Sequence, residues 1–460
     1  MLVALDLGSS SVRAVAVDED GAPVALARRK VTLHAGPDGS GTLDPDDYLA
    51  GLVACLDELH PRLSGVHTVA ASAQWHSIIG LDRSGAPVTA AVTWADTRPG
   101  EQPGSAPTDP EAFHQRTGSW YHGLYWTVRL PWLRRLAPTA TRFTGLPDYV
   151  LGSLLGERTT SVSLASGTGL LDTAAMCWDE EALSLAGTHP STLDPLAPAG
   201  WAGRLSTRYA RRWPALAEAR WAPPTGDGAA SNVGAGCWDE RHVAVTVGTS
   251  AAVRVVQRVT GALPRLAPGV WRYRVDHDRV VTGFASSAGG NVHAWAVRNL
   301  RLPDPQPSPT LVPGSHGLTV VPLLAGTRPP EQIPAGSGLL SGLSFASTAE
   351  HVLAALLEGV CFELAHGLAQ VEQALPAPAT PVLCGGAVAA SPWWCRALAA
   401  AFGRPVEIVS DPETGIRGAA ALALGRVGSR PAWTRLEPSA QDIASMTAAA
   451  ERYTRLRADA

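Results

Sequence analysis

Residues 3–17 read VALDLGSSSVRAVAV, which places a short polar turn between two runs of apolar and β-branched residues. The first run ends near Asp6 and the second begins near Val12, and this pattern predicts a β-hairpin. The turn, Gly8 followed by three serines, presents backbone N–H groups and hydroxyls that suit a bound anion. Asp6 stands at the end of the first strand, where a carboxylate can hold Mg²⁺ through water.

The same arrangement returns in the second half of the chain. Residues 243–250 read VAVTVGTS, in register with residues 3–10, and another β-rich run follows. A strand with a Gly-Ser turn is common by itself, but a pair at matching places predicts two related α/β domains that face one cleft. We expect an N-terminal domain over 1–238, a C-terminal domain over 239–430 and a terminal helix over 431–460, which agrees with a length of 460 residues.

Composition excludes several classes of protein. A formal net charge of −4 without a basic run argues against a nucleic-acid surface or a polybasic membrane patch. No run of about 18 apolar residues predicts a membrane span, and a strand that begins at residue 2 leaves no room for a signal peptide. The six cysteines form no CxxC pair, which is typical of reduced thiols. We expect a cytoplasmic protein without a zinc site.

Lys30 is the single lysine of the chain, and no GxxxxGK[ST] motif is present. The protein is therefore not a P-loop NTPase. Phosphate groups must be held by backbone N–H groups, hydroxyls, arginines and a metal. Three glycine turns that each follow a predicted strand are candidates, because glycine lets a phosphate approach the backbone closely. They are Gly8-Ser9-Ser10, Gly248-Thr249-Ser250 and Gly385-Gly386-Ala387.

Asp227 is the best candidate for a general base. It lies between Gly226 and Gly228, so we expect a strained backbone and an exposed carboxylate. A carboxylate with a pKa near its reference value of about 4 is ionised at pH 7 and can deprotonate a hydroxyl. The alternative is an ordinary Asp-Gly turn.

Polar and aromatic residues follow two predicted strands. Gln74, Trp75 and His76 follow one strand, and Asp96 and Arg98 follow another. Ligands gather at the carboxyl ends of strands in α/β sheets. Sugars use amides and carboxylates for their hydroxyls and an aromatic face for their C–H surface. A structural role for His76 stays open at this point.

The order and spacing of these motifs resemble the FGGY family of carbohydrate kinases, and within it the gluconokinases, across nearly all of residues 2–425. The stretches that carry the likeness are 6–13, 74–77, 94–98, 165–169, 227–236, 247–250, 385–387 and 418–420. The resemblance implies two actin-like, ribonuclease-H-like domains that close over ATP and a sugar. It also implies Mg²⁺ as a cofactor and a small-molecule sugar or sugar acid as the partner, and it leaves a homodimer open.

Carried over position by position, the resemblance implies a catalytic base at Asp227 and a metal-associated acid at Asp6. The ATP-binding positions are Ser9, Ser10, Ser11, Arg13, Gly248, Thr249, Gly290, Gly385, Gly386 and Ala387. The sugar-binding positions are Gln74, Trp75, His76, Asp96, Arg98, His122 and Asp227.

Two departures from the gluconokinase pattern concern the substrate. Trp75 stands where gluconokinases have methionine, and residues 116–126 carry added aromatic side chains, while His122 and Arg129 are retained. A gluconate-like substrate is favoured, with another sugar acid, a ketose, a polyol or a glycosylated metabolite as alternatives. Two other classes are a degenerate nucleotide-binding actin-like protein, against which Asp6 and Asp227 argue, and an actin-like ATPase that acts on proteins.

Overall fold

The predicted hairpin forms and opens the first of two large β-sheets in the computed structural model. The structure describes residues 1–18, 23–100, 106–331, 333–411, 413–428 and 430–459. β1 (Leu2–Leu7) pairs antiparallel with β2 (Ser11–Val17) and parallel with β6 (Thr68–Ala73). β3 (Pro23–Lys30) extends the sheet from β2, and β12 (Arg220–Trp221) and β13 (Thr225–Gly226) both pair with β6. β1 is buried on both faces, which explains its nearly continuous apolar sequence.

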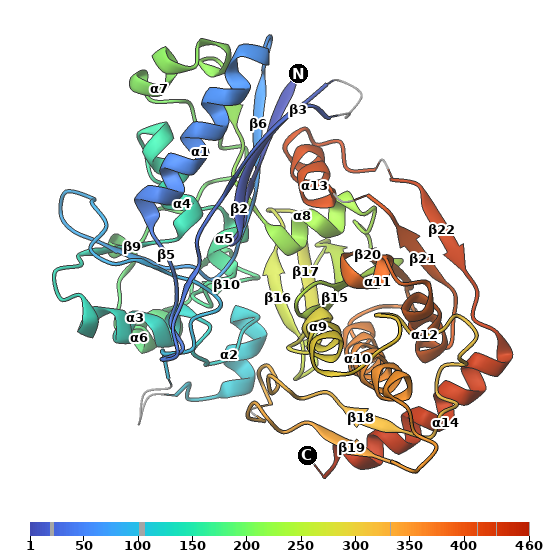
Figure 1. The fold of residues 1–460 in the computed structure, drawn as a ribbon. Coiled ribbons are helices and arrows are strands. Elements are labelled where there is room, and N and C mark those ends of the chain that lie inside the picture. The colour runs from blue at the N-terminus through green and yellow to red at the C-terminus, as the bar shows by residue number, and fades with distance from the viewer. Residues whose placement is uncertain (19–22, 101–105, 332, 412, 429, 460) are drawn as a thin grey trace.

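The second sheet repeats this pattern, as the sequence predicted. β14 (His242–Val247) pairs antiparallel with β15 (Ala251–Arg258) and parallel with β20 (Thr380–Gly385). The strand order is β16-β17-β15-β14-β20-β21-β22, with β16 at Trp271–Arg274, β17 at Arg279–Ser286, β21 at Val406–Val409 and β22 at Trp433–Leu436. The two sheets lie in separate halves of the molecule (Figure 1). β22 belongs to residues 431–460, for which the sequence predicted only a helix.

Helices cover both sheets. α1 (Pro45–Leu59) begins after Asp44, whose carboxylate accepts hydrogen bonds from the N–H groups of Asp46 and Asp47. α10 (Ala349–Glu372) lies in the core of the second half. Within the described residues it is the one helix long and apolar enough to cross a membrane, and 78% of its most apolar window is buried inside the protein.

The remaining elements connect or cover these sheets. The other α-helices are α2 (Pro110–Thr117), α3 (Trp126–Leu136), α4 (Leu146–Leu155), α5 (Val162–Ser166), α6 (Glu180–Leu185), α7 (Thr207–Arg212), α8 (Asp227–Gly234), α9 (Gly290–Asn299), α11 (Gly386–Ala389), α12 (Pro392–Phe402), α13 (Thr414–Ala423) and α14 (Ala440–Arg457). The short strands are β4 (His34–Ala35), β5 (Gly41–Leu43), β7 (Ile79–Leu81), β8 (Ala91–Val92), β9 (Arg142–Thr144), β10 (Leu171–Asp172), β11 (Cys177–Trp178), β18 (Thr319–Val321) and β19 (Leu339–Ser341). Single 3₁₀ turns lie at His60–Arg62, Pro190–Thr192 and Pro214–Leu216.

α8 and α13 cross at very short range and join the two halves. A Cβ atom at Gly234 would lie 1.8 Å from the carbonyl oxygen of Thr414, and one at Gly418 would lie 1.8 Å from that of Ala230. α13 also packs against β1 and β6 of the first sheet, although its residues follow the second sheet along the chain. Small residues at this crossing therefore fix the position of α8, whose first residue is Asp227.

We expect Gly418→Ala to lower the free energy of unfolding by about 1–3 kcal/mol or more, because the added methyl group would force the two helices apart. Gly415→Ala on the same helix is the matched control, since a Cβ there would first meet Ser72 at 3.4 Å. Urea denaturation of both variants measures the difference. Equal stability of Gly418→Ala and the wild-type protein would contradict this close crossing.

Candidate active site

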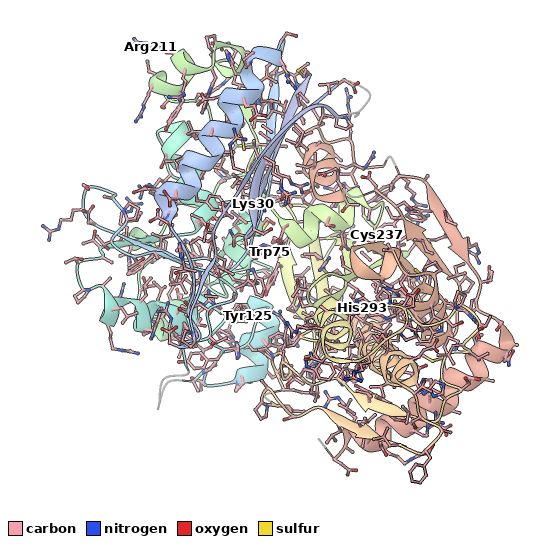
Figure 2. All side chains as sticks on the ribbon, viewed as in Figure 1. Lys30, Trp75, Tyr125, Arg211, Cys237 and His293 are labelled. Carbon is pink, nitrogen blue, oxygen red and sulfur yellow. The ribbon has the colours of Figure 1, made fainter. Side chains whose placement is uncertain are left out.

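A cavity of about 210 Å³ lies where the two halves meet, and both halves supply its walls. Trp75, His76 and Tyr125 come from the first half, and Figure 2 labels Trp75 and Tyr125 at this junction. The other polar and aromatic side chains of the wall are those of Trp94, Trp120, Asp227, Ser250, Arg254, Trp271, Tyr273 and Arg328. The cavity therefore combines one carboxylate, two arginines and several aromatic rings.

Asp227 is the only carboxylate among the described residues that line this cavity. It opens α8, its carboxylate accepts the Gly228 N–H at 2.7 Å, and the residue stays accessible from the cleft. The surrounding protein raises the pKa of Asp227 to about 6, against the opposing effects of the Gly228 N–H and of Arg254. This corrects the prediction of an unperturbed pKa. The expected strained backbone at Asp227 was also wrong. Asp227 is the first residue of helix α8, and the residue of the cavity wall with a positive φ angle, 68°, is His76.

The raised pKa of Asp227 predicts the pH dependence of any reaction in which it acts as the base. A base works only when deprotonated, so we expect kcat/KM to be level above pH 7 and to fall about tenfold per pH unit below pH 6. His76 should not contribute, since burial lowers its pKa to about 3. A pH–rate profile from pH 4.5 to 8.5 measures this, and a profile that stays flat down to pH 5 would exclude Asp227 as the titrating group.

Trp75 supports the turn that carries Asp227. Its ring lies so close that a Cβ atom would stand 1.9 Å from it at Gly226 and 2.8 Å at Gly228. Its Nε1–H donates to the Ser163 carbonyl oxygen at 3.0 Å, and 8% of the residue is exposed. Trp75 is therefore mainly a packing residue with one edge on the cavity wall.

His76 is held in one orientation on the same wall. Its Nδ1 lies 2.7 Å from the Gly167 carbonyl oxygen, which can only accept, so Nδ1 carries the proton. The His76 carbonyl oxygen in turn accepts a hydrogen bond from Arg129 at 2.7 Å. Because the low pKa keeps the ring neutral, Nε2 is an acceptor. Such a group suits a hydroxyl of a ligand.

The other sequence-predicted sugar residues lie outside the lining of this cavity. Gln74 is buried beside the hairpin turn, with its Nε2 3.5 Å from the Gly8 carbonyl oxygen. The Asp96 carboxylate accepts from the guanidinium of Arg98 and from the Gly41 N–H. His122 Nδ1 accepts from the Leu124 N–H at 3.0 Å. Their roles in sugar binding stay predictions.

The glycine turns of the second half converge. The carbonyl oxygens of Gly248 and Thr249 accept hydrogen bonds from the N–H groups of Gly290 and Asn291, at 2.7 and 3.0 Å. Gly386 has a φ of 71°, and a Cβ there would lie 2.0 Å from the Val247 carbonyl oxygen, so only glycine fits. The exposed Gly248-Thr249 turn, the start of α9 and the start of α11 are thus held together.

A second cavity, of about 480 Å³, opens beside these turns. Its polar and glycine lining consists of Ser231, Thr246, Gly385, Gly386, Ser410, Asp411 and Thr414. α8 separates the two cavities, because Asp227 faces the first and Ser231 faces the second. Arg254 reaches both cavities, because it lines the first and donates a hydrogen bond to Oγ1 of Thr246, which lines the second, at 2.6 Å. The carboxylate thus stands beside a larger, glycine-lined space.

The first hairpin turn and the strand ends beside it carry side chains that suit a metal and phosphates. Ser9 is half-buried, Ser10 exposed and Ser11 buried. Arg13 is paired on both sides, with Asp6 Oδ2 at 2.7 Å and with Glu413 at 2.7 Å. Both bonds to Asp6 fall on Oδ2, and the negative charge of Asp6 acts on Asp227.

Asp6 and Asp227 suit Mg²⁺ better than they suit a metal whose ligands all come from the protein. Within the described ranges no cluster of three or more His, Cys, Asp or Glu side chains is arranged as a metal site. Mg²⁺ usually takes one or two carboxylates and completes its shell with water and substrate phosphates. Asp6, with Asp227 near it, provides that donor set.

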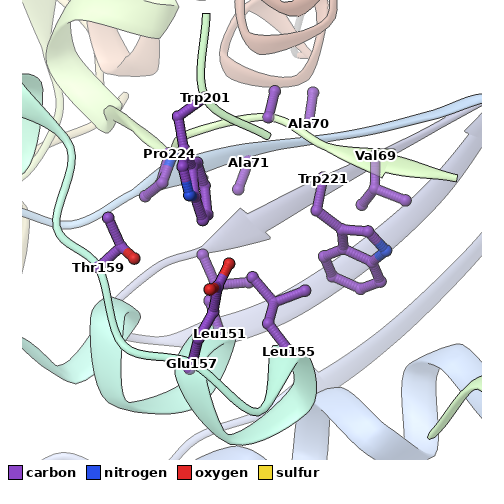
Figure 3. Close-up of a pocket in the computed structure, with 12 residues that line it drawn as sticks. Val69, Ala70, Ala71, Leu151, Leu155, Glu157, Thr159, Trp201, Trp221 and Pro224 are labelled. Atoms are coloured by element: carbon purple, nitrogen blue, oxygen red, sulfur yellow. The ribbon is translucent and has the colours of Figure 1, made fainter. Parts of the chain in front are cut away.

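A further pocket, between β6 and α4, is unrelated to this chemistry (Figure 3). Trp201, Trp221 and Leu151 enclose it, with Glu157 at its edge, and its volume is about 10 Å³. A space of that size holds no more than a water molecule. This pocket is therefore too small for a substrate.

The sequence did not point to Arg254, Trp271, Tyr273 and Arg328 as residues of the site, whereas Tyr125 belongs to the aromatic stretch 116–126 that was expected to bear on the substrate. Arg254 carried a signal, because it is a charged residue within an otherwise buried apolar strand, β15. Tyr273 carried none, since it comes from the opposite half and meets Tyr125 through hydroxyls 2.8 Å apart.

Comparison with known proteins agrees with this geometry. The N-terminal domain model of the FGGY family of carbohydrate kinases matches residues 1–234, and its C-terminal domain model matches residues 243–425. The chain is 27% identical to the gluconokinase of Bacillus subtilis, over 93% of this chain and 88% of the relative. It is 29% identical to the xylulose kinase of Streptomyces rubiginosus, over 94% and 89%.

A solved structure shows the same fold. The crystal structure of gluconate kinase from Lactobacillus acidophilus superposes with a TM-score of 0.89 and 22% identity, covering 100% of this chain and 97% of that one. This confirms the predicted fold class of two ribonuclease-H-like, actin-like ATPase domains. Since both family models match in order along the chain, the protein belongs to the FGGY family of carbohydrate kinases.

Proposed function

We propose that the protein transfers the γ-phosphate of ATP to a hydroxyl of a gluconate-like sugar acid, with Asp227 as the general base. One observation supports this assignment most strongly. Asp227, whose pKa is raised to about 6, stands between an aromatic cavity of about 210 Å³ and a glycine-lined cavity of about 480 Å³. A carboxylate poised near neutral pH takes a proton from the attacking hydroxyl while the two cavities hold the reactants in line.

The other roles follow from position. The Gly248-Thr249 and Gly385-Gly386 turns, with the Ser9-Ser10 hairpin turn, contact the phosphates of ATP. Asp6 holds Mg²⁺, which neutralises charge that develops on the phosphates. Closure of the two halves excludes water, so ATP hydrolysis without sugar is slow.

A coupled assay of ADP release tests the proposal, with gluconate first and xylulose, ribulose, glycerol and larger glycosides as the panel. We expect gluconate or another aldonate to give the highest kcat/KM. Failure of the whole panel to raise ADP release above the rate without sugar would contradict the proposed function.

A ketose such as xylulose is the second candidate. Two xylulose kinases of Streptomyces are each 29% identical to this chain, which is slightly more than the gluconokinases. A ketose lacks the negative charge of an aldonate. A cationic side chain of the cavity would therefore form an ion pair with a bound aldonate but not with a bound ketose.

A further inference from the structure

Arg328 lies at one end of the cavity that contains Asp227. It also lines an adjoining chamber of about 290 Å³, so it stands where the two spaces meet. Its Nε is buried and has no hydrogen-bond partner within the described part of the chain. Burial of this N–H without an acceptor costs its hydration and gives no hydrogen bond in exchange.

The charge of Arg328 is also unbalanced, in contrast to the arginines around it. Arg254 donates to Asn232 and Thr246 and lies near the Asp227 carboxylate. Arg457, in the adjoining chamber, is paired with Glu331 and Glu363.

Among the residues that the structure describes, the groups whose pKa responds to the charge of Arg328 include no Asp or Glu. They are His76, His122, Tyr125 and Tyr273. Removing a cation from water without an opposite charge is costly, so an anionic ligand that supplies this charge would bind strongly.

We propose that Arg328 binds the carboxylate of an aldonate substrate. The inference rests on the proposed function, because it takes the Asp227 cavity as the sugar site. A guanidinium matches a carboxylate with two parallel N–H···O bonds, and an uncharged polyol or ketose would leave it unpaired. The charge of Arg254 lowers the pKa of Asp227, whereas the charge of Arg328 lowers the pKa of Tyr125 and of Tyr273. The carboxylate is therefore held apart from the hydroxyl that reacts.

Matched pairs of ligands test this directly. Gluconate, xylonate and erythronate differ from glucitol, xylitol and erythritol only in a carboxylate in place of a primary alcohol. We expect the full-length wild-type protein, in isothermal titration calorimetry, to bind at least one acid about 10- to 100-fold more tightly than its alditol, the range of a charge-assisted pair. Arg328→Gln should remove this preference and leave alditol affinity within about twofold, since only the acid uses the guanidinium.

Two further variants separate charge from structure. Arg83→Gln removes the same charge from an exposed turn of the first half and should keep the preference. Arg328→Lys should restore part of it. Because the described residues give Arg328 no ion pair and leave its Nε without an acceptor, Arg328→Gln should melt no lower than wild type without ligand, and the acid should raise its melting temperature less than that of wild type.

The outcomes for binding and for catalysis are distinct. No preference for any acid over its alditol in the wild-type protein, or an equal loss for both ligands in Arg328→Gln, would overturn the role of Arg328. Arg328-dependent binding of an acid that is never phosphorylated would support this inference and contradict the proposed function alone.

Discussion

Asp227→Asn is expected to lower kcat by about 10²–10⁴, the usual contribution of a general base. Asparagine keeps the shape of the side chain and the start of α8 but cannot accept the proton of the attacking hydroxyl. The affinity for ATP should stay close to that of wild type, since the glycine-lined cavity lies on the other side of α8. Initial rates of ADP release and a fluorescent nucleotide titration measure the two effects separately.

Asp278→Asn is the matched control, because it makes the same chemical change at an exposed position between β16 and β17. It should leave kcat unchanged. Retention of more than half of the wild-type kcat by Asp227→Asn would remove this carboxylate from the mechanism.

The second large effect concerns the phosphate turns. The double variant Ser10→Val/Thr249→Val should raise KM for ATP or lower kcat, by about 10²–10⁴ in kcat/KM, because two hydrogen bonds to charged oxygens are lost. At position 249 valine keeps the β-branched shape of threonine and replaces the hydroxyl with a methyl group, and at position 10 the larger valine side chain lies at an exposed place. The chain has no P-loop lysine, so we expect transfer to depend on Mg²⁺ and EDTA to abolish activity.

The sugar affinity of this double variant provides its control, and it should be unchanged because neither residue lines the Asp227 cavity. Each single variant should give roughly half of the free-energy effect if the two turns act independently. Full activity in EDTA, or a double variant as active as wild type, would contradict the account of phosphate binding.

The fold could be predicted from sequence because its decisive features are local. Apolar runs on either side of a Gly-Ser turn specify a hairpin, and their repetition in β14 and β15 revealed the second domain. The predicted domain bounds, 1–238, 239–430 and 431–460, stay predictions. α13 illustrates what local patterns miss, because nothing in its own sequence shows that it packs against the first sheet.

The site was less predictable because its properties arise from tertiary contacts. Nothing beside Asp227 in sequence reports the surrounding protein that raises its pKa, and nothing beside Trp75 indicates that its ring packs against Gly226 and Gly228. Asp96 and Arg98 follow a strand as expected, yet they pair with each other. The unpaired charge of Arg328 is visible only once the residues around it are known.

Phosphorus NMR of one reaction mixture tests the central claim most directly. With Mg²⁺, ATP and gluconate, the account predicts a new phosphomonoester resonance that grows in step with ADP, with little inorganic phosphate. Asp227→Asn should slow both signals together. ADP that appears with an equal amount of inorganic phosphate, at a rate independent of the sugar, would show an ATPase instead and would contradict the account.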